Sequence, residues 1–238
     1  MIVFNEEFYF FSPYSQNLFK VNKNGEDQLI QVEKKFNLAA SLIDSILFFS
    51  KLNQHPVLVI LKNGQFSETI SLEEPYSDFN FNDLTSYKSN LYFLDKKSGQ
   101  IIKYPYLGDL KWDFPRLWLK NKKAIDGKSI AVDGSIWVLN KDNSISRYCA
   151  GALRETIKLD LFPYPKDFSK IFASPHLPYL YLLEPVQKRI IIISKTGQVV
   201  KQFQSQKFDN LLDFAVSEDG KTIYLLNGLK VYLLTNLK

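Results

Sequence analysis

The sequence predicts an all-β fold made of six similar repeats. Six apolar stretches of five residues, each ending in a small or polar side chain, recur along the 238 residues, and their last residues lie 38, 45, 45, 44 and 43 positions apart. In all-β chains a period of about 43 residues is typical of propeller blades. We therefore expect a six-bladed β-propeller with four-stranded antiparallel blades, and we name the recurring stretch the marker strand. The marker strands are Phe8–Ser12, Ile46–Ser50, Leu91–Asp95, Ile136–Asn140, Leu180–Glu184 and Ile223–Asn227.

Composition supports this fold class. Hydrophobic residues make up 45% of the chain and aromatic residues 15%, which favours strands around a sizeable core over disorder. We expect one propeller domain over residues 1–238, either a whole protein or a domain excised from a longer one.

Within each repeat, the marker is predicted to be the second strand, and a third strand starts about five residues after it. A glycine then follows in five repeats, which predicts a tight hairpin with positive φ before a fourth strand such as 198–203. The third strands are Leu18–Val21, Val57–Ile60, Ile101–Tyr104, Ile145–Tyr148, Ile190–Ile193 and Lys230–Leu233, and the glycines are Gly25, Gly64, Gly108, Gly151 and Gly197.

The first strand of a repeat precedes the marker and is rich in small residues, which suits the innermost strand of a blade. Examples are Ser129–Val132, Lys170–Ser174 and Asp213–Ser217. The last repeat stops after its third strand. Ile2–Phe4 is therefore either the innermost strand of the first blade or the outer strand that closes the sixth. Residues 105–126 are predicted to be a long connection with a poor fourth strand.

The scarcity of arginine argues against a nucleic-acid partner. The chain carries a net charge of +5, but only four of its 30 basic residues are arginine, the residue that reads bases and phosphates best. The basic segment 111–128, which contains Trp112 and Trp118, is the one place where an acidic or single-stranded partner could bind.

The sequence gives little support to a disulfide-bonded, secreted or membrane-spanning protein. The single cysteine, Cys149, rules out an intrachain disulfide and is predicted to be a buried, inert thiol. The first residues lack the basic and apolar regions of a signal peptide, and no apolar run reaches the ~20 residues of a membrane helix. We expect a soluble monomer, cytoplasmic by default.

Three stretches resemble known propeller families. Glu184–Phe203 resembles an NHL repeat, with an acidic strand end, a short turn, Arg189-Ile190, an apolar strand and a glycine hairpin, and Asp95–Ile101 is similar to it. Ser217–Tyr224 is similar to the first hairpin of TolB-like and lactonase-like propellers. The Asn-His-Leu triplet is absent, and the isolated Trp112-Asp113 does not indicate WD40 repeats. The resemblance implies six blades around a channel and no single activity.

Polar residues at equivalent strand ends define the candidate site. Because the first and second strands of a blade are antiparallel, the end of the marker and the start of the first strand should lie on the same face. The marker ends include Asp95, Asn140 and Glu184, beside Ser12, Ser50 and Asn227; the first strands should start near Asn37, Asp83, Asp126, Lys170 and Asp213. These residues would line the mouth of the central channel, which could hold Ca²⁺, whose ligands are carboxylate and amide oxygens. The alternative is structural, since Asp and Asn also terminate strands by hydrogen bonding to the next turn.

Two functions remain open from the sequence. The first is a non-catalytic module that binds a protein or a small ligand on one propeller face, with no cofactor. The second is a calcium-dependent hydrolase of the lactonase or esterase type at the mouth of the channel. His55 and His176 stand alone in predicted turns, which gives little support to a triad or a zinc site and favours the binding module.

Overall fold

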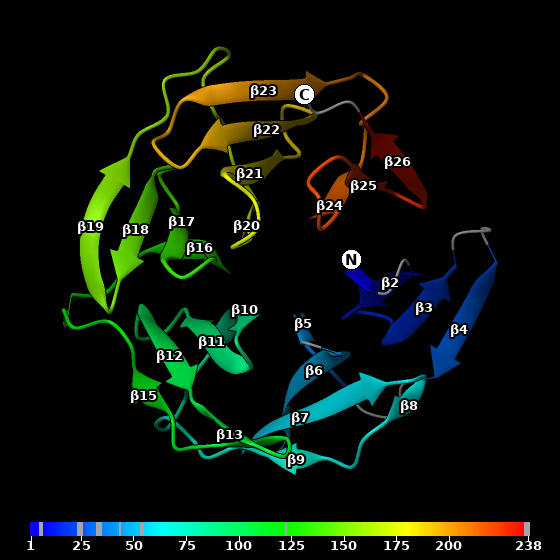
Figure 1. The fold of residues 1–238 in the computed structure, drawn as a ribbon, viewed down its shortest axis with the longest axis vertical. Helices are drawn as coiled ribbons and strands as arrows, with labels where there is room; N and C mark the ends of the chain where they lie inside the picture. The colour runs from blue at the N-terminus through cyan, green and yellow to red at the C-terminus, as the bar shows by residue number, and fades with distance from the viewer. Residues whose placement is uncertain are drawn as a thin grey trace. The chain divides into compact units, whose positions relative to one another are not determined.

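The computed structural model of the chain describes residues 1–4, 7–22, 26–31, 35–42, 44–52, 55–121 and 123–235, without the side chains of Phe4, Gln31 and Leu52. Every regular element in these ranges is a β-strand, and Figure 1 numbers the strands in chain order. The chain forms two compact units, residues 1–118 and 119–238. Each unit contains three antiparallel sheets with the topology of propeller blades, so the predicted fold class, a six-bladed β-propeller, is confirmed.

The first unit contains blades one to three. Blade one pairs its four strands in chain order, blade two carries two short strands beside its third, and blade three receives its fourth strand only after an inserted hairpin, β13–β14. The strands are β1 Ile2–Phe4, β2 Glu7–Ser12, β3 Asn17–Val21 and β4 Asp27–Gln31; β5 Leu38–Leu42, β6 Ser45–Leu52, β7 His55–Lys62, β8 Gln65–Phe66 and β9 Ile70–Ser71; β10 Phe81–Tyr87, β11 Asn90–Asp95, β12 Gln100–Tyr104, β13 Tyr106–Gly108, β14 Lys111–Trp112 and β15 Arg116–Leu117.

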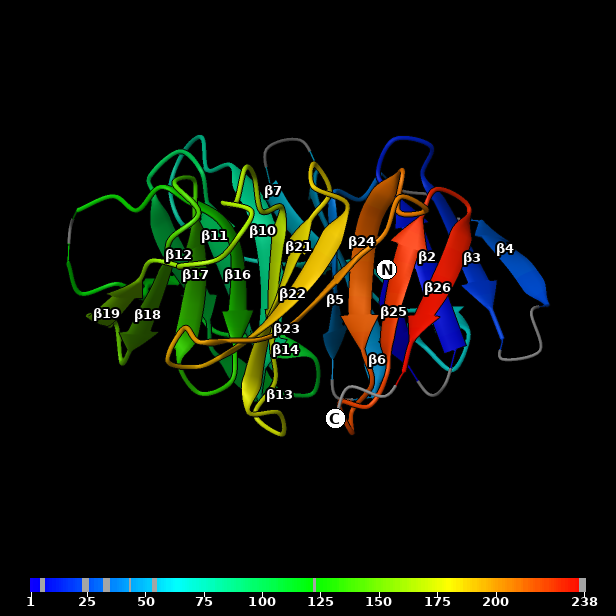
Figure 2. The same cartoon turned by 90° about the horizontal axis from the view of Figure 1, so that it is seen from above.

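The second unit contains blades four to six. Blades four and five have four strands each in chain order, whereas blade six pairs three strands among the described residues, which lie side by side in Figure 2. The strands are β16 Gly127–Val132, β17 Ile136–Asn140, β18 Ile145–Cys149 and β19 Ala152–Ile157; β20 Lys170–Ala173, β21 Tyr179–Glu184, β22 Arg189–Ser194 and β23 Val199–Gln204; β24 Leu211–Val216, β25 Ile223–Asn227 and β26 Lys230–Leu234.

The register of the marker strands confirms that they are equivalent. Tyr92, Trp137, Tyr181 and Tyr224 each stand three residues before the end of their marker. Each is paired with the first strand on one side and the third on the other. The placement of Ile2–Phe4, which the sequence left open, is decided by its pairing with β2, where Ile2 lies opposite Tyr9. This segment is therefore the first strand of blade one.

The hydrophobic cores lie between successive blades of each unit. In the first unit, Phe81 and Phe93 of blade three stack with 4.4 Å between their ring centroids, and Phe49 of blade two packs on Phe93 at 4.8 Å. In the second unit, one cluster joins blades four and five and another joins blades five and six. Side chains from both faces of a strand are buried, which explains the nearly continuous apolar marker strands.

Three predicted hairpin glycines lie between third and fourth strands as expected. Gly64, Gly151 and Gly197 have φ values of +77°, +80° and +90°. Gly108 also has positive φ, but it lies in the inserted hairpin β13–β14, because blade three delays its fourth strand to β15. Gly25 lies outside the described residues.

Candidate functional site

The first strands of blades three, four and six begin with a shared irregularity. In β10, β16 and β24 one extra residue interrupts the pairing with the marker, so that Asn82, Lys128 and Leu212 are bulged. A β-bulge redirects the side chain that follows it. The residues opposite the penultimate marker position are Leu38, Asp83, Ser129, Lys170 and Asp213.

This register corrects two of the expected equivalences. Ser129, not Asp126, occupies the position that corresponds to Asp83 and Asp213. Asp126 lies before β16, where its carbonyl accepts a hydrogen bond from the Lys141 amide at 2.9 Å and its exposed carboxylate forms an ion pair with the Lys141 ammonium at 2.5 Å. In blade two, Leu38 takes the place expected for Asn37. The register runs without interruption from the hairpin at Val132–Ile136, so it places Ser129 opposite Leu139, three residues beyond Asp126.

In the second unit, three adjacent first strands place polar side chains in a row. The Lys170 ammonium forms an ion pair with the Asp213 carboxylate, joining β20 to β24. The Ile171 amide donates to the Ser129 hydroxyl at 3.4 Å, which joins β20 to β16. We call Ser129, Lys170 and Asp213 the polar row. Ser129 was missed by the sequence analysis; counting outwards from the hairpin, with Val132 opposite Ile136, would have found it opposite Leu139.

The Lys170–Asp213 pair is partly withdrawn from water. The side chains are 35% and 20% exposed, and the Lys170 ammonium lies 5.6 Å from the centroid of the Phe214 ring. Burial alone would raise the pKa of Asp213, but nearby positive charge, in which Lys170 has the largest part, outweighs it and lowers this pKa to about 2. The carboxylate is therefore ionised at every physiological pH.

Asp83 has the same local geometry in the first unit. Its Oδ1 accepts a hydrogen bond from the Leu84 amide at 2.9 Å, as Asp213 Oδ1 does from the Phe214 amide at 2.7 Å. Both aspartates follow a bulge, so the shared geometry is a consequence of the backbone.

The polar marker ends hold the adjoining loops in place. Asp95 is fully buried and accepts hydrogen bonds from the amides of Asn80 at 2.5 Å and Ser98 at 2.7 Å. Burial would raise the pKa of Asp95, but hydrogen bonds from the hydroxyls of Ser98 and Tyr76 lower it below its ordinary value. Asn140 donates to the hydroxyls of Ser144 at 3.0 Å and Ser146 at 2.9 Å.

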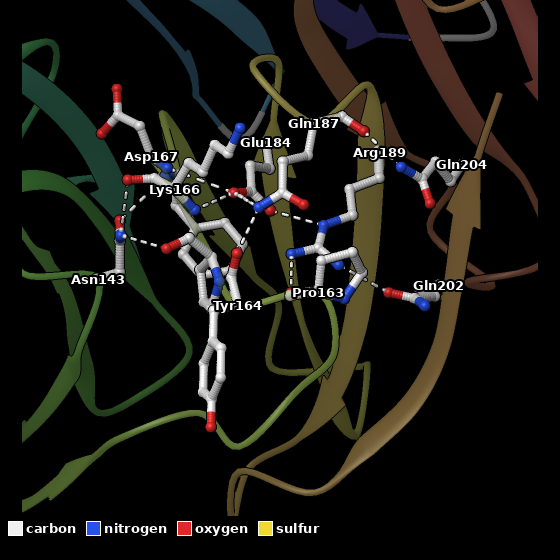
Figure 3. A network of polar contacts seen from close by, with 12 residues as sticks. Asn143, Pro163, Tyr164, Lys166, Asp167, Glu184, Gln187, Arg189, Gln202 and Gln204 are labelled. Carbon is white, nitrogen blue, oxygen red and sulfur yellow. Dashed lines mark hydrogen bonds and ion pairs between the residues drawn. The ribbon is translucent and has the colours of Figure 1, made fainter. Parts of the chain in front are cut away.

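Glu184 is the centre of a larger network (Figure 3). It forms an ion pair with Arg189 at 2.6 Å, and both side chains are 0% exposed. Its Oε1 accepts from the amides of Lys166 at 2.5 Å and Asp167 at 3.3 Å, and from the Gln187 side chain at 3.0 Å.

Arg189 carries the same network to the fourth strand and to the preceding loop. It donates to Gln202 at 3.1 Å and to the carbonyl of Pro163 at 2.7 Å. The acidic strand end and the arginine of the NHL-like stretch are thus cross-strand partners that fasten the 158–169 loop. The sequence analysis did not single out Arg189 as a partner of Glu184, although the two stand opposite each other across the predicted turn.

The residues with potential for nucleophilic or metal chemistry lie apart. Exposed His55 begins β7 and lies 2.6 Å from Glu74, and exposed His176 lies in the β20–β21 turn. Cys149 is half-buried, not fully buried as expected, because it ends a strand at the rim of its sheet; its thiol lies 3.2 Å from the Ser135 hydroxyl. Within the described ranges, no group of three or more His, Cys, Asp or Glu side chains could hold a metal ion, and no helix could cross a membrane.

Comparison with known proteins shows the fold alone. No family profile and no curated protein matches the chain. A streptogramin B lyase structure is 17% identical over 99% of this chain and 78% of its own, with a TM-score of 0.64. A catalytically inactive virginiamycin B lyase from Staphylococcus aureus, solved with quinupristin, is 15% identical over 99% of this chain and 79% of its own, with a TM-score of 0.63. A chain from a nidogen–laminin complex is 10% identical over 85% and 77%, with a TM-score of 0.62.

Proposed function

We propose that this chain is a non-catalytic binding module that holds a ligand or partner where the first strands of its blades begin. The observation that supports the proposal is the Lys170–Asp213 ion pair, which links two blades. The side chain of Lys170 is 35% exposed and that of Asp213 is 20% exposed. Partly desolvated charges interact more strongly than fully solvated ones and keep a fixed direction, so they favour a ligand of matching polarity.

The polar row indicates the chemistry of the ligand. An ammonium, a carboxylate and a hydroxyl lie on three adjacent strands, at Lys170, Asp213 and Ser129. A ligand with its own carboxylate and amine, or a polar side chain of a protein partner, could form ion pairs and hydrogen bonds with these groups. Proteins of this fold include one solved with a small molecule, quinupristin, and one solved in a protein complex, so both kinds of partner suit the architecture.

A thermal-shift screen with amino acids and dipeptides tests the proposal. A bound zwitterion should raise the Tm of the wild type, because binding to the folded state alone stabilises it. The Lys170→Met/Asp213→Asn double variant removes both charges together and should lose this response. The matched control, Lys221→Met/Asp219→Asn, removes an exposed ion pair of the same blade and should keep it.

An equal Tm shift in all three proteins would place binding elsewhere and contradict the proposal. Asp83→Asn applies the same test to the first unit, where Asp83 occupies the equivalent position.

Calcium titration separates this module from the hydrolase alternative. We expect calcium to leave the Tm of the wild type unchanged. A rise in Tm that disappears in Asp213→Asn would instead favour a calcium-dependent enzyme.

A further inference from the structure

Blade six differs from the other blades at its outer edge. Its sheet consists of β24, β25 and β26, and no described strand pairs with the second edge of β26. In each of the other blades, the third strand is covered by a further strand. An uncovered edge exposes a row of backbone N–H and C=O groups that can pair with an added strand.

The exposure of one equivalent position in the third strands shows the effect of an uncovered edge. The third-strand residue opposite the penultimate marker residue is 0% exposed in five blades, at Leu18, Leu58, Ile101, Ile145 and Ile190. In blade six the same position is Val231, which is only half-buried. On the same strand Leu233 is 60% exposed. The apolar sequence of β26 therefore suits a covered strand better than an edge.

The strands that cover the third strands in the other blades share a feature that indicates which sequence could pair with β26. In four blades the residue opposite this position is large and apolar, and it packs on the core between blades: Ile30, Ile70, Ile157 and Phe203. In blade five, Phe203 stands opposite Ile190, and the next residue, Gln204, stands opposite Arg189. A strand added to β26 in the same register would place an apolar residue opposite Val231 and its successor opposite exposed Lys230.

We propose that β26 is a docking edge for an extended segment of a partner protein, which adds as the fourth strand of blade six. The segment pairs antiparallel with Lys230–Leu234, carries Ile or Phe opposite Val231, and has Asp or Glu directly after that residue, opposite Lys230. This edge is separate from the polar row, and the inference does not depend on the proposed function.

The chemistry favours a partner segment over a second copy of β26. The strand reads Lys-Val-Tyr-Leu-Leu and contains no acidic residue, so two copies paired edge to edge could not neutralise Lys230. A partner strand with an acidic residue opposite Lys230 can neutralise its charge.

A peptide derived from the fourth strand of blade five provides the probe. It has the sequence of residues 198–205 with Gln204→Glu, so that Phe203 supplies the apolar anchor and the new carboxylate meets Lys230. A second peptide carries Gln204→Lys. We expect fluorescence anisotropy to show that the wild type binds the glutamate peptide about five-fold more tightly than the lysine peptide, since opposite and like charges across a strand pair differ by about 1 kcal/mol.

Charge reversal in the protein should invert this preference. Lys230→Glu, at an exposed position, should bind the lysine peptide more tightly, whereas the control Lys221→Glu, at the other end of the blade, should behave as the wild type. Hydrogen exchange at residues 230–234 should slow when the preferred peptide is bound.

Three results would overturn the inference. They are no binding of either peptide at 1 mM, equal affinities in the wild type and Lys230→Glu, or protection that appears outside residues 230–234. Sedimentation supplies a further check, because a dimer whose formation itself protects residues 230–234 would make a second copy the occupant and contradict a partner segment.

Discussion

Single polar side chains at the marker ends hold the loops that enter the first strands. Asp95 binds the amide of Asn80, Asn227 binds that of Asn210 at 2.8 Å, and Glu184 binds those of Lys166 and Asp167. A short acceptor at the end of one strand thus satisfies backbone donors before the next strand begins. Glu184 differs from the others because its charge is fully buried and paired.

Arg189→Met should strongly destabilise the protein. The substitution leaves the Glu184 carboxylate buried without its cation, and breaking a buried ion pair in this way costs about 3–5 kcal/mol. Urea unfolding measures the loss. The Glu184→Gln/Arg189→Met double variant, which contains no buried charge but keeps an acceptor for the Lys166 amide, should recover part of it. A single variant that loses less than about 1 kcal/mol would show that the pair is dispensable.

Asp213 should make stability depend on pH at the acidic end. Its pKa is about 2 in the folded chain, against about 3.9 when unfolded, so the unfolded chain takes up the proton first as the pH falls. The stabilisation from the positive charge around Asp213 is therefore fully present above about pH 4 and is lost as the pH falls to about 2, by about 2 kcal/mol.

Unfolding of the wild type and Asp213→Asn between pH 5 and pH 2 tests this dependence. The stability advantage of the wild type should shrink over that range. An advantage that stays constant would mean that the carboxylate titrates alike in both states.

At the scale of elements, the hairpins between third and fourth strands combine a backbone requirement with a packing requirement. Gly64 and Gly197 both have positive φ, which L-residues with a branched side chain rarely adopt. Gly64 has open space around a built Cβ, whereas at Gly197 a Cβ would collide with the Cγ2 of Ile157 in the fourth strand of blade four. The hairpin at Gly197 in blade five therefore packs closely on blade four, and a side chain larger than hydrogen does not fit between them.

Gly197→Val should cost more stability than Gly64→Val. Both variants force a β-branched residue into positive φ, at about 1–3 kcal/mol, and only the first also overpacks a blade contact. Thermal unfolding of the two variants gives the difference. Equal losses would show that the backbone conformation alone sets the requirement, and an unchanged Tm in both would show that neither hairpin needs glycine.

At the scale of the whole molecule, part of the positive charge is paired with carboxylates. Lysines bind acidic neighbours on both units, for example Lys20 with Glu7, Lys97 with Asp78, and Lys195 with Asp133. Paired lysines present less net field than a free basic stripe of the kind that binds phosphate backbones.

We therefore expect no retention on single- or double-stranded DNA at about 150 mM salt, measured by filter binding. Retention that falls steeply as salt rises would reveal phosphate contacts. In that case the basic segment 111–128 would be the first region to mutate.

The sequence by itself determined the repeat, the order of the strands within a blade and the glycine hairpins. These features are local, because strand patterning and positive φ act over a few residues. The six marker strands and the equivalence of Tyr92, Trp137, Tyr181 and Tyr224 were predictable for this reason.

Only the tertiary structure decided which polar residues meet. The register of β16 against β17 is set by the hairpin between them, which a pattern of polarity does not fix, so the sequence placed Asp126 where Ser129 stands. The Lys170–Asp213 pair and the anchoring of the 158–169 loop by Arg189 join segments far apart in the chain. Ile2–Phe4 could have paired at either end of the fold, because strand propensity does not name a partner; the structure pairs it with β2, its neighbour in the sequence.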